Sequence, residues 1–360
     1  MKIIPNILIG LTSLLLLFSC SRQVEPDYPE EQLVVVTFDA DTRAPGDSDP
    51  EDRRINSLRV LGYRVSDGTL AFNEKVYGFP TSTENKTELA NQRVTVKTGK
   101  FTVVFIANEH SSAANNLTTL LDGITPDNAT TNTLSYFRSN AMFDFTSFDR
   151  GVNIPMVAIK QNIIIQGDNK LFDPELGSSL ISTVWPVVLT RAGIRVDVTI
   201  KISPNQLDAW IDQPSTDNKK KLRFYNLPRW VSVFPGTYDT GTTKTELYAF
   251  HSAAGTETLP DDGVFKVFKR KFILPEFGSL TLAESGALTF GLPQGPLGEK
   301  KGALINLESD GTPKDWAGMY GYTIPRNHYL DVTLTIAETD VTFSIDVLSW
   351  DDIAINHELQ

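Results

Sequence analysis

The sequence contains few of the residue types from which catalytic and metal sites are most often built. Cysteine occurs once, at Cys20, so neither a disulfide framework nor a cysteine metal site can form. Histidine occurs four times, never at the spacing of a metal-binding pair: His110, His251, His328 and His357. No glycine-rich phosphate loop and no GxSxG elbow is present. We therefore expect no metal, no cofactor and no catalytic residue, and we predict that the protein is not an enzyme.

One class of enzyme stays open as an alternative. The two carboxylates of a glycoside hydrolase need not be close in sequence, and the chain has 44 aspartates and glutamates. The adjacent pairs Asp261-Asp262 and Asp351-Asp352 fall in predicted turns or strand edges. A surface glycosidase would need two such groups facing each other across a cleft.

Positive charge is also scarce. Lysine and arginine together number 33 against those 44 acids, which leaves a net charge of −11. A protein that binds nucleic acid needs a basic face to neutralise phosphates. We expect no nucleic-acid partner.

Long hydrophobic runs are absent except for a short one near the start. Ile7 to Phe18 is almost wholly apolar and follows Lys2, but it is shorter than the roughly 20 residues of a membrane-spanning helix. It is typical of a signal peptide. The run ends in Leu17-Phe18-Ser19-Cys20, with a small residue directly before the only cysteine, which is the bacterial lipobox pattern. We predict a signal peptide over residues 1–19 and diacylglycerol on the Cys20 thiol. The alternative, an ordinary signal peptide, explains neither the position nor the uniqueness of Cys20.

Residues 20–54 are predicted to form a tether, a first strand and a polar connection. Ser21 to Glu31 is polar and acidic with two prolines, as in a flexible linker. Leu33 to Phe38 (LVVVTF) is strongly β-forming, and Asp39 to Arg54 is again polar. A strand placed between two polar segments must pair with a distant part of the fold or be removable.

Alternating apolar residues, by contrast, are plentiful. Leu61, Tyr63 and Val65 would share one face of a strand, and Ile194 to Ile202 alternates throughout, as in a half-buried antiparallel strand. The 24 glycines and 20 prolines supply turns between short strands. We predict an all-β fold with a few short helices. Two transthyretin-like β-sandwich domains in tandem would cover residues 55–184 and 185–360.

Two short helices are expected in this fold. Leu117, Leu120, Leu121 and Ile124 have helical spacing and predict a lid over one end of a sandwich. Ser203 as a cap, with Pro204 at the first helical position, predicts a helix that extends to about Ile211.

The last ten residues, 351–360, have the pattern of a strand. Ile353, Ile355 and Leu359 alternate with mostly polar residues, so one face would be apolar. The segment is either a strand donated to another chain or the last strand of the chain's own sandwich.

Several unusual features together resemble the FimA-type fimbrillins, the subunits of type V pili. They are the lipobox at Cys20, Thr42-Arg43-Ala44 after the first strand, the segment LTRAGIRV from Leu189, the segment IPRNHY from Ile324, and Trp350 near the end. The resemblance covers most of the chain. It implies a structural subunit of a fimbria at the outer membrane and cell surface.

The resemblance also implies how the subunit matures. An arginine-specific protease would cut between Arg43 and Ala44, and the lipid anchor would leave together with the first strand. The strand-exchange residues would then be Leu33, Val34, Val35, Val36 and Phe38 in the groove, and Ile353, Ile355 and Leu359 in the donor. The partners would be other fimbrial subunits in a head-to-tail polymer. Arg53 and Arg54 are rival cleavage sites.

A binding module that keeps its lipid anchor is the main alternative. A tip adhesin or a surface glycan-binding lipoprotein would display tryptophans in one groove. We expect instead that the tryptophans lie mainly in the core between sheets: Trp185, Trp210, Trp230, Trp316 and Trp350.

Overall fold

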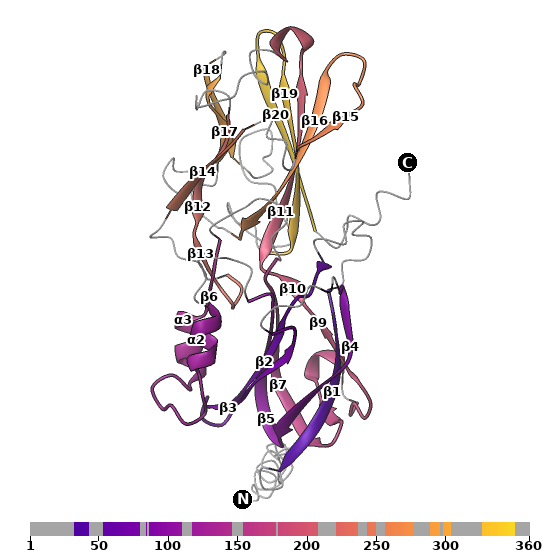
Figure 1. The fold of residues 1–360 in the computed structure, drawn as a ribbon, viewed down its shortest axis with the longest axis vertical. Coiled ribbons are helices and arrows are strands. Elements are labelled where there is room, and N and C mark those ends of the chain that lie inside the picture. Colours follow the sequence, from indigo (N-terminus) through magenta and orange to yellow (C-terminus); the bar gives the residue numbers. More distant parts are fainter. Residues whose placement is uncertain are drawn as a thin grey trace, which may run out of the picture.

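The computed structural model describes thirteen parts of the chain. They are residues 32–42, 53–79, 84, 86–109, 117–145, 154–177, 179–207, 221–236, 243–249, 256–276, 289–295, 298–303 and 326–349. Within them the fold is an elongated stack of β-sheets whose strands run roughly along the long axis (Figure 1). The predicted all-β class with a few short helices is confirmed.

The lower half in Figure 1 is a sandwich of two sheets. The first sheet has the order β4-β1-β9: β1 (Leu33–Asp41), β4 (Glu88–Lys97) and β9 (Trp185–Val188). The second has the order β10-β7-β5-β2-β3, with β8 also on β7: β2 (Leu58–Arg64), β3 (Leu70–Tyr77), β5 (Gly99–Ala107), β7 (Met156–Gly167), β8 (Lys170–Phe172) and β10 (Thr190–Arg191). Their facing side chains form one hydrophobic cluster, which we call the groove cluster; it includes Val36, Phe38, Phe105 and Trp185.

Short helices cover the other face of the second sheet. They are α2 (Leu117–Gly123) and α3 (Leu134–Asn140), and η2 (Pro174–Leu176) follows β8. The buried side chains Leu117, Leu121 and Ile124 pack in a second cluster with Leu61 and Val104 of the sheet. The predicted helix therefore exists, but it lies against the face of a sheet rather than over one end of the sandwich.

The upper half contains two further sheets. One has the order β15-β16-β11-β19-β20: β11 (Gly193–Ile202), β15 (Thr256–Leu259), β16 (Lys266–Pro275), β19 (His328–Ile336) and β20 (Val341–Ser349). The other has the order β14-β12-β17-β18: β12 (Lys221–Pro228), β14 (Thr243–Ala249), β17 (Thr289–Gly295) and β18 (Gly298–Ala303). β11 is antiparallel to β16 as expected, but it is parallel to β19.

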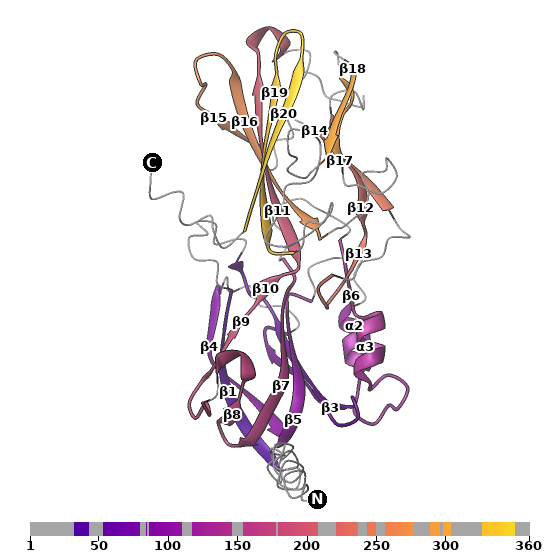
Figure 2. The ribbon, with the colours of Figure 1, turned by 180° about the vertical axis from the view of Figure 1, so that it is seen from behind.

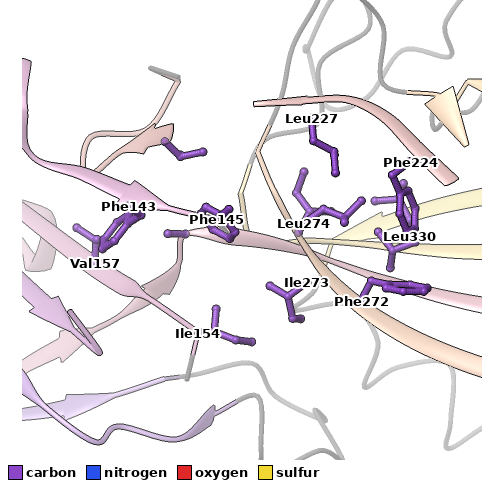
Figure 3. Packing of buried hydrophobic residues seen from close by; sticks show 14 of the residues in the cluster. Phe143, Phe145, Ile154, Val157, Phe224, Leu227, Phe272, Ile273, Leu274 and Leu330 are labelled. Carbon is purple, nitrogen blue, oxygen red and sulfur yellow. The ribbon is translucent and has the colours of Figure 1, made fainter. Parts of the chain in front are cut away.

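The two halves share one core. β6 (Met142–Asp144) from the lower half pairs with β13 (Trp230–Ser232) from the upper half. Arg229 donates two hydrogen bonds of 3.0 Å to the carboxylate of Asp144 across this junction. The second cluster continues from Phe143 and Phe145 to Ile273 and Leu274 (Figure 3).

The change from one half to the other lies later than the predicted boundary at Trp185. Trp185–Val188 and Thr190–Arg191 both pair with strands of the lower half, and the upper half begins at Gly193. The predicted helix after Ser203 is only a 3₁₀ turn, η3 (Pro204–Gln206), in its described part. Ser203 makes no side-chain cap, because the Gln206 N–H donates to the Ser203 carbonyl at 2.8 Å. The Gln206 side chain donates to the Glu338 carbonyl and completes no capping box.

Candidate functional site

β1 lies in the middle of its sheet and is held on both edges. β4 runs antiparallel along its whole length, from the Leu33–Lys97 pair to the Asp41–Glu88 pair. β9 runs parallel to it on the other edge, but only from Phe38 onward. The first half of that second edge therefore has no strand beside it within the described residues.

The inner face of β1 is an uninterrupted apolar stripe. Val34, Val36, Phe38 and Ala40 are 8%, 1%, 0% and 1% exposed. Of the residues predicted to take part in strand exchange, Val34, Val36 and Phe38 thus enter the groove cluster. Val35 lies on the outer face and is half-buried, and Leu33 is 71% exposed. Each buried large side chain contributes roughly 1.5–3 kcal/mol as an upper value.

Phe38 occupies the deepest position of the stripe. Its ring meets the ring of Phe105 edge to face at 5.2 Å between centroids, and Phe105 meets Trp185 at 5.3 Å. The Trp185 Nε1–H donates a hydrogen bond of 2.9 Å to the buried carboxylate of Asp173. The side chains of this floor thus contact one another directly, while the backbone of Trp185 also pairs with Phe38 of β1.

The exposed first half of the β1 edge is covered by the turn between β7 and β8. The Val35 N–H donates to Asp168 Oδ1 at 2.8 Å, and the Thr37 N–H donates to Asn169 Oδ1 at 2.8 Å. The Asn169 N–H in turn donates to the Val35 carbonyl at 2.9 Å. Figure 2 shows β8 beside β1. Asn169 has a φ of 49°, a left-handed conformation that asparagine tolerates better than most residues.

Both ends of β1 are hydrogen-bonded to neighbouring segments of the same chain. At the start, Gln32 and Thr98 exchange two hydrogen bonds, from the Gln32 N–H to Thr98 Oγ1 and from the Thr98 N–H to the Gln32 carbonyl. At the end, the buried Thr42 hydroxyl lies 3.2 Å from the Arg53 carbonyl and 3.3 Å from the Thr87 carbonyl. The predicted cleavage bond follows Thr42 by one residue. Arg53 itself lies 3.7 Å from the Asp41 carboxylate.

Other predicted site residues lie outside the described part of the chain. They are Cys20, Arg43, Ala44, Ile353, Ile355 and Leu359. The description of the C-terminal region ends with Ser349 at the end of β20.

Two other features, metal-binding clusters and membrane-spanning helices, are absent from the described residues. Among them, no group of three His, Cys, Asp or Glu side chains could hold a metal ion. In the same regions no helix is long and apolar enough to cross a membrane. The acidic pair Asp261 and Asp262 makes ion pairs with Lys266 and Lys201 and lies in a turn, as the sequence indicates.

The two described tryptophans have different environments. Trp185 is buried in the groove cluster, which confirms the expectation for this residue. Trp230 is half-buried, and the Arg229 guanidinium lies 5.0 Å above its ring. The remaining three tryptophans fall outside the described residues.

Asp168 and Asn169 are the residues of this site that the sequence did not reveal. The only available signal was a Gly-Asp-Asn run after Ile163 to Ile165, which is typical of a turn. A turn signal does not show that the turn contacts the backbone of a distant strand, and it does not show which strand that is.

One comparison with known proteins covers the segment that contains β1 and the groove cluster. Residues 33–191 match the family model of the major fimbrial subunit protein (FimA). The match begins with the first residue of β1 and ends with the last residue of β10, so it coincides with the sheets of the lower half. No curated protein sequence matches the chain.

Solved structures of fimbrial proteins are similar to the whole fold. One is the tip fimbrial protein Mfa3 from Porphyromonas gingivalis with a C-terminal truncation: 15% identity, 89% of this chain and 100% of that chain covered, TM-score 0.53. Another is a fimbrilin from the same organism: 13% identity, 88% and 97% covered, TM-score 0.47. At this identity the first likeness establishes the fold alone.

The family match concerns the lower half of the fold. The central strand β1 and the groove cluster lie within the matched segment. Over residues 33–191 the chain is therefore similar to the FimA family of major fimbrial subunits.

Proposed function

We propose that the protein is a structural subunit of a type V fimbria at the cell surface. In this proposal it is exported as a lipoprotein precursor, cut after Arg43, and polymerised head to tail by strand exchange. The processing enzyme would be an arginine-specific protease.

The position of β1 is the observation that carries the proposal. β1 is a central strand, yet a single cut after Arg43 would leave it attached only by hydrogen bonds and apolar contacts. Its departure would free one edge of β4 and the facing edge of β9, and would uncover the groove cluster. An open edge beside an apolar groove is a template for a strand from another chain.

The last ten residues are the proposed donor. They follow β20, and Ile353, Ile355 and Leu359 would share one face of a strand, as Val34, Val36 and Phe38 do, with His357 at the position between Ile355 and Leu359. A contact between the tail of one copy and the groove of the next is heterologous and does not close on itself, so it generates an open filament.

Before the cut, diacylglycerol on Cys20 would hold the precursor at the outer membrane. Cys20→Ala removes the only thiol in the chain, so metabolic labelling with a fatty acid should give no labelled protein. Label that persists in this variant would contradict the lipoprotein assignment.

The N-terminal residue of protein recovered from cell-surface filaments tests the processing step. We expect Ala44. A start at Arg54 or Ile55 would move the cut to a rival arginine and keep the mechanism. A start at Cys20 would contradict it and would favour the alternative, an anchored tip adhesin or glycan-binding module.

A further inference from the structure

We infer that the turn between β7 and β8 is a backbone clamp that seats the strand of a second subunit in the groove. The clamp consists of Asp168 and Asn169. This inference rests on the proposed strand exchange and names the residues that would position the incoming strand.

The contacts of the clamp are independent of the side chains of the strand it holds. Asp168 Oδ1 and Asn169 Oδ1 accept the N–H groups of Val35 and Thr37, and the Asn169 N–H donates to the Val35 carbonyl. All three bonds go to backbone atoms of β1. A different sequence in the same extended conformation would offer the same three groups.

The clamp also covers the part of the β1 edge that does not pair with β9. β9 pairs with β1 only from Phe38 onward, so the clamp supplies the partners upstream of that point. Without it, the first half of any strand in the groove would pair with β4 alone.

The clamp and the apolar groove together select the phase of the incoming strand. In an extended chain, N–H groups on one edge belong to every second residue, and here they belong to residues whose side chains point outward. A one-residue slip that keeps N–H groups on the clamp would move the whole apolar set to the outer face. A one-residue slip that keeps the apolar set inside would instead displace the N–H groups from the clamp. Proline is excluded at both clamped positions because it has no N–H.

The proposed donor meets these requirements. With the donor running in the direction of β1 and Ile353 and Ile355 facing inward, the N–H groups of Ala354 and Asn356 would face the clamp. The segment 351–360 contains no proline.

Matched substitutions can remove the clamp without disturbing the turn. Asn169→Gly removes the acceptor and keeps the left-handed conformation, whereas Asn169→Asp keeps an acceptor. Asp168→Ala and Asp168→Asn form the equivalent pair. Melting of the uncut variants verifies that each one folds.

The test uses the full chain, cut with an arginine-specific protease, and a fluorescent peptide of residues 32–42 as the probe. Binding of this peptide tests the groove whether or not the tail is the natural donor. We expect the double variant Asp168→Ala/Asn169→Gly to bind the peptide at least about tenfold more weakly, because two hydrogen bonds are lost. Asp168→Asn/Asn169→Asp should bind nearly as the native chain does.

A peptide N-methylated at Val35 and Thr37 completes a double-mutant cycle. Methylation should weaken binding to the native chain far more than binding to the alanine–glycine variant, since that variant has no acceptors to lose. Equal binding of the unmethylated peptide to native and variant chains would overturn the clamp and leave strand exchange intact. No peptide binding to the cut native chain would overturn strand exchange, and the clamp with it.

Discussion

Among single residues, Phe38 is the side chain that most firmly fixes β1 in place. It is fully buried and packs against Phe105 over a floor braced by Trp185. Phe38→Ala should lower the free energy of unfolding of the intact precursor by about 3–5 kcal/mol, because the surrounding rings cannot collapse into the space. Denaturant unfolding measures the change.

Thr37→Ala is the matched control for Phe38. Its side chain lies on the outer face and is half-buried, and its backbone N–H is unchanged by the substitution. A comparable loss of stability in both variants would mean that the apolar stripe on the inner face of β1 does not hold the strand in place.

Two aspartates of the upper half have pKa values shifted in opposite directions. Burial would raise the pKa of Asp197, but hydrogen bonds and charges from Arg195 and Lys269 outweigh burial and hold it below 3.8. Burial raises the pKa of Asp331; Lys269 partly offsets the rise, and the charge of Asp197 adds to it. Asp331 Oδ1 is buried without a hydrogen-bond partner in the described regions.

These shifts predict opposite effects of the two Asp→Asn substitutions. Asp197→Asn should cost about 3 kcal/mol at neutral pH, because it leaves the buried Arg195 guanidinium without its anionic partner. Since the folded pKa lies below 3.8, the difference from the native chain should persist down to that pH and fade as the pH falls through the folded value.

Asp331→Asn should instead stabilise the protein at neutral pH. The cost of charging Asp331 is absent below pH 3.8 and develops as the pH rises through its higher folded pKa. Unfolding curves of native protein and both variants across this range measure both effects. Parallel curves at every pH would show that neither carboxylate titrates differently in the folded state.

For β1 as an element, the proposed processing predicts its release. Cutting the chain after Arg43 should let β1 dissociate slowly and uncover the groove cluster. A dye that binds exposed apolar surface should then gain fluorescence, and excess peptide of residues 32–42 should reverse the gain. Arg43→Ala, treated identically, is the control and should show no change; an equal gain in that variant would place the cut elsewhere.

The sequence predicted elements whose residues carry the signal themselves. β3 and β5 follow directly from their apolar patterns, and the spacing of Leu117, Leu121 and Ile124 gives α2. The sequence did not predict which strands pair when they are far apart in the chain. Nothing local indicates that β9 crosses back to β1, which is why the boundary at Trp185 differs from the observed one.

The outer face of β11 shows a second limit. Its alternation predicted a half-buried strand, but Arg195 and Asp197 are also buried because they pair with each other. A buried ion pair has the same sequence pattern as a solvated one.

For the candidate site, the sequence indicated the groove strand and its inner residues, whereas the clamp depends on a turn more than a hundred residues away.

For the whole molecule, the proposed strand exchange predicts that the tail decides between a monomer and a filament. Deleting residues 353–360 should leave a folded protein that no longer polymerises, because the groove of the next copy loses its strand. Circular dichroism verifies folding and electron microscopy counts filaments. Unfolding of the upper half would identify the tail as an internal strand, and normal filaments would exclude it as the donor.

A charge on one face of the tail gives a finer test. Ile355→Asp should reduce assembly far more than Asn356→Asp, because only one face of the strand enters the apolar groove. Equal effects of the two substitutions would contradict a one-sided insertion.

The direction of the strands has a mechanical consequence. β1 and β4 lie roughly along the long axis of the molecule (Figure 1), and one core continues through both halves. A pull along that axis loads their ladder in shear, so its hydrogen bonds bear the tension together and must rupture together. A ladder pulled crosswise would unzip one bond at a time. Subunits joined through this groove would therefore resist stretching in flow by geometry, without requiring unusually tight binding.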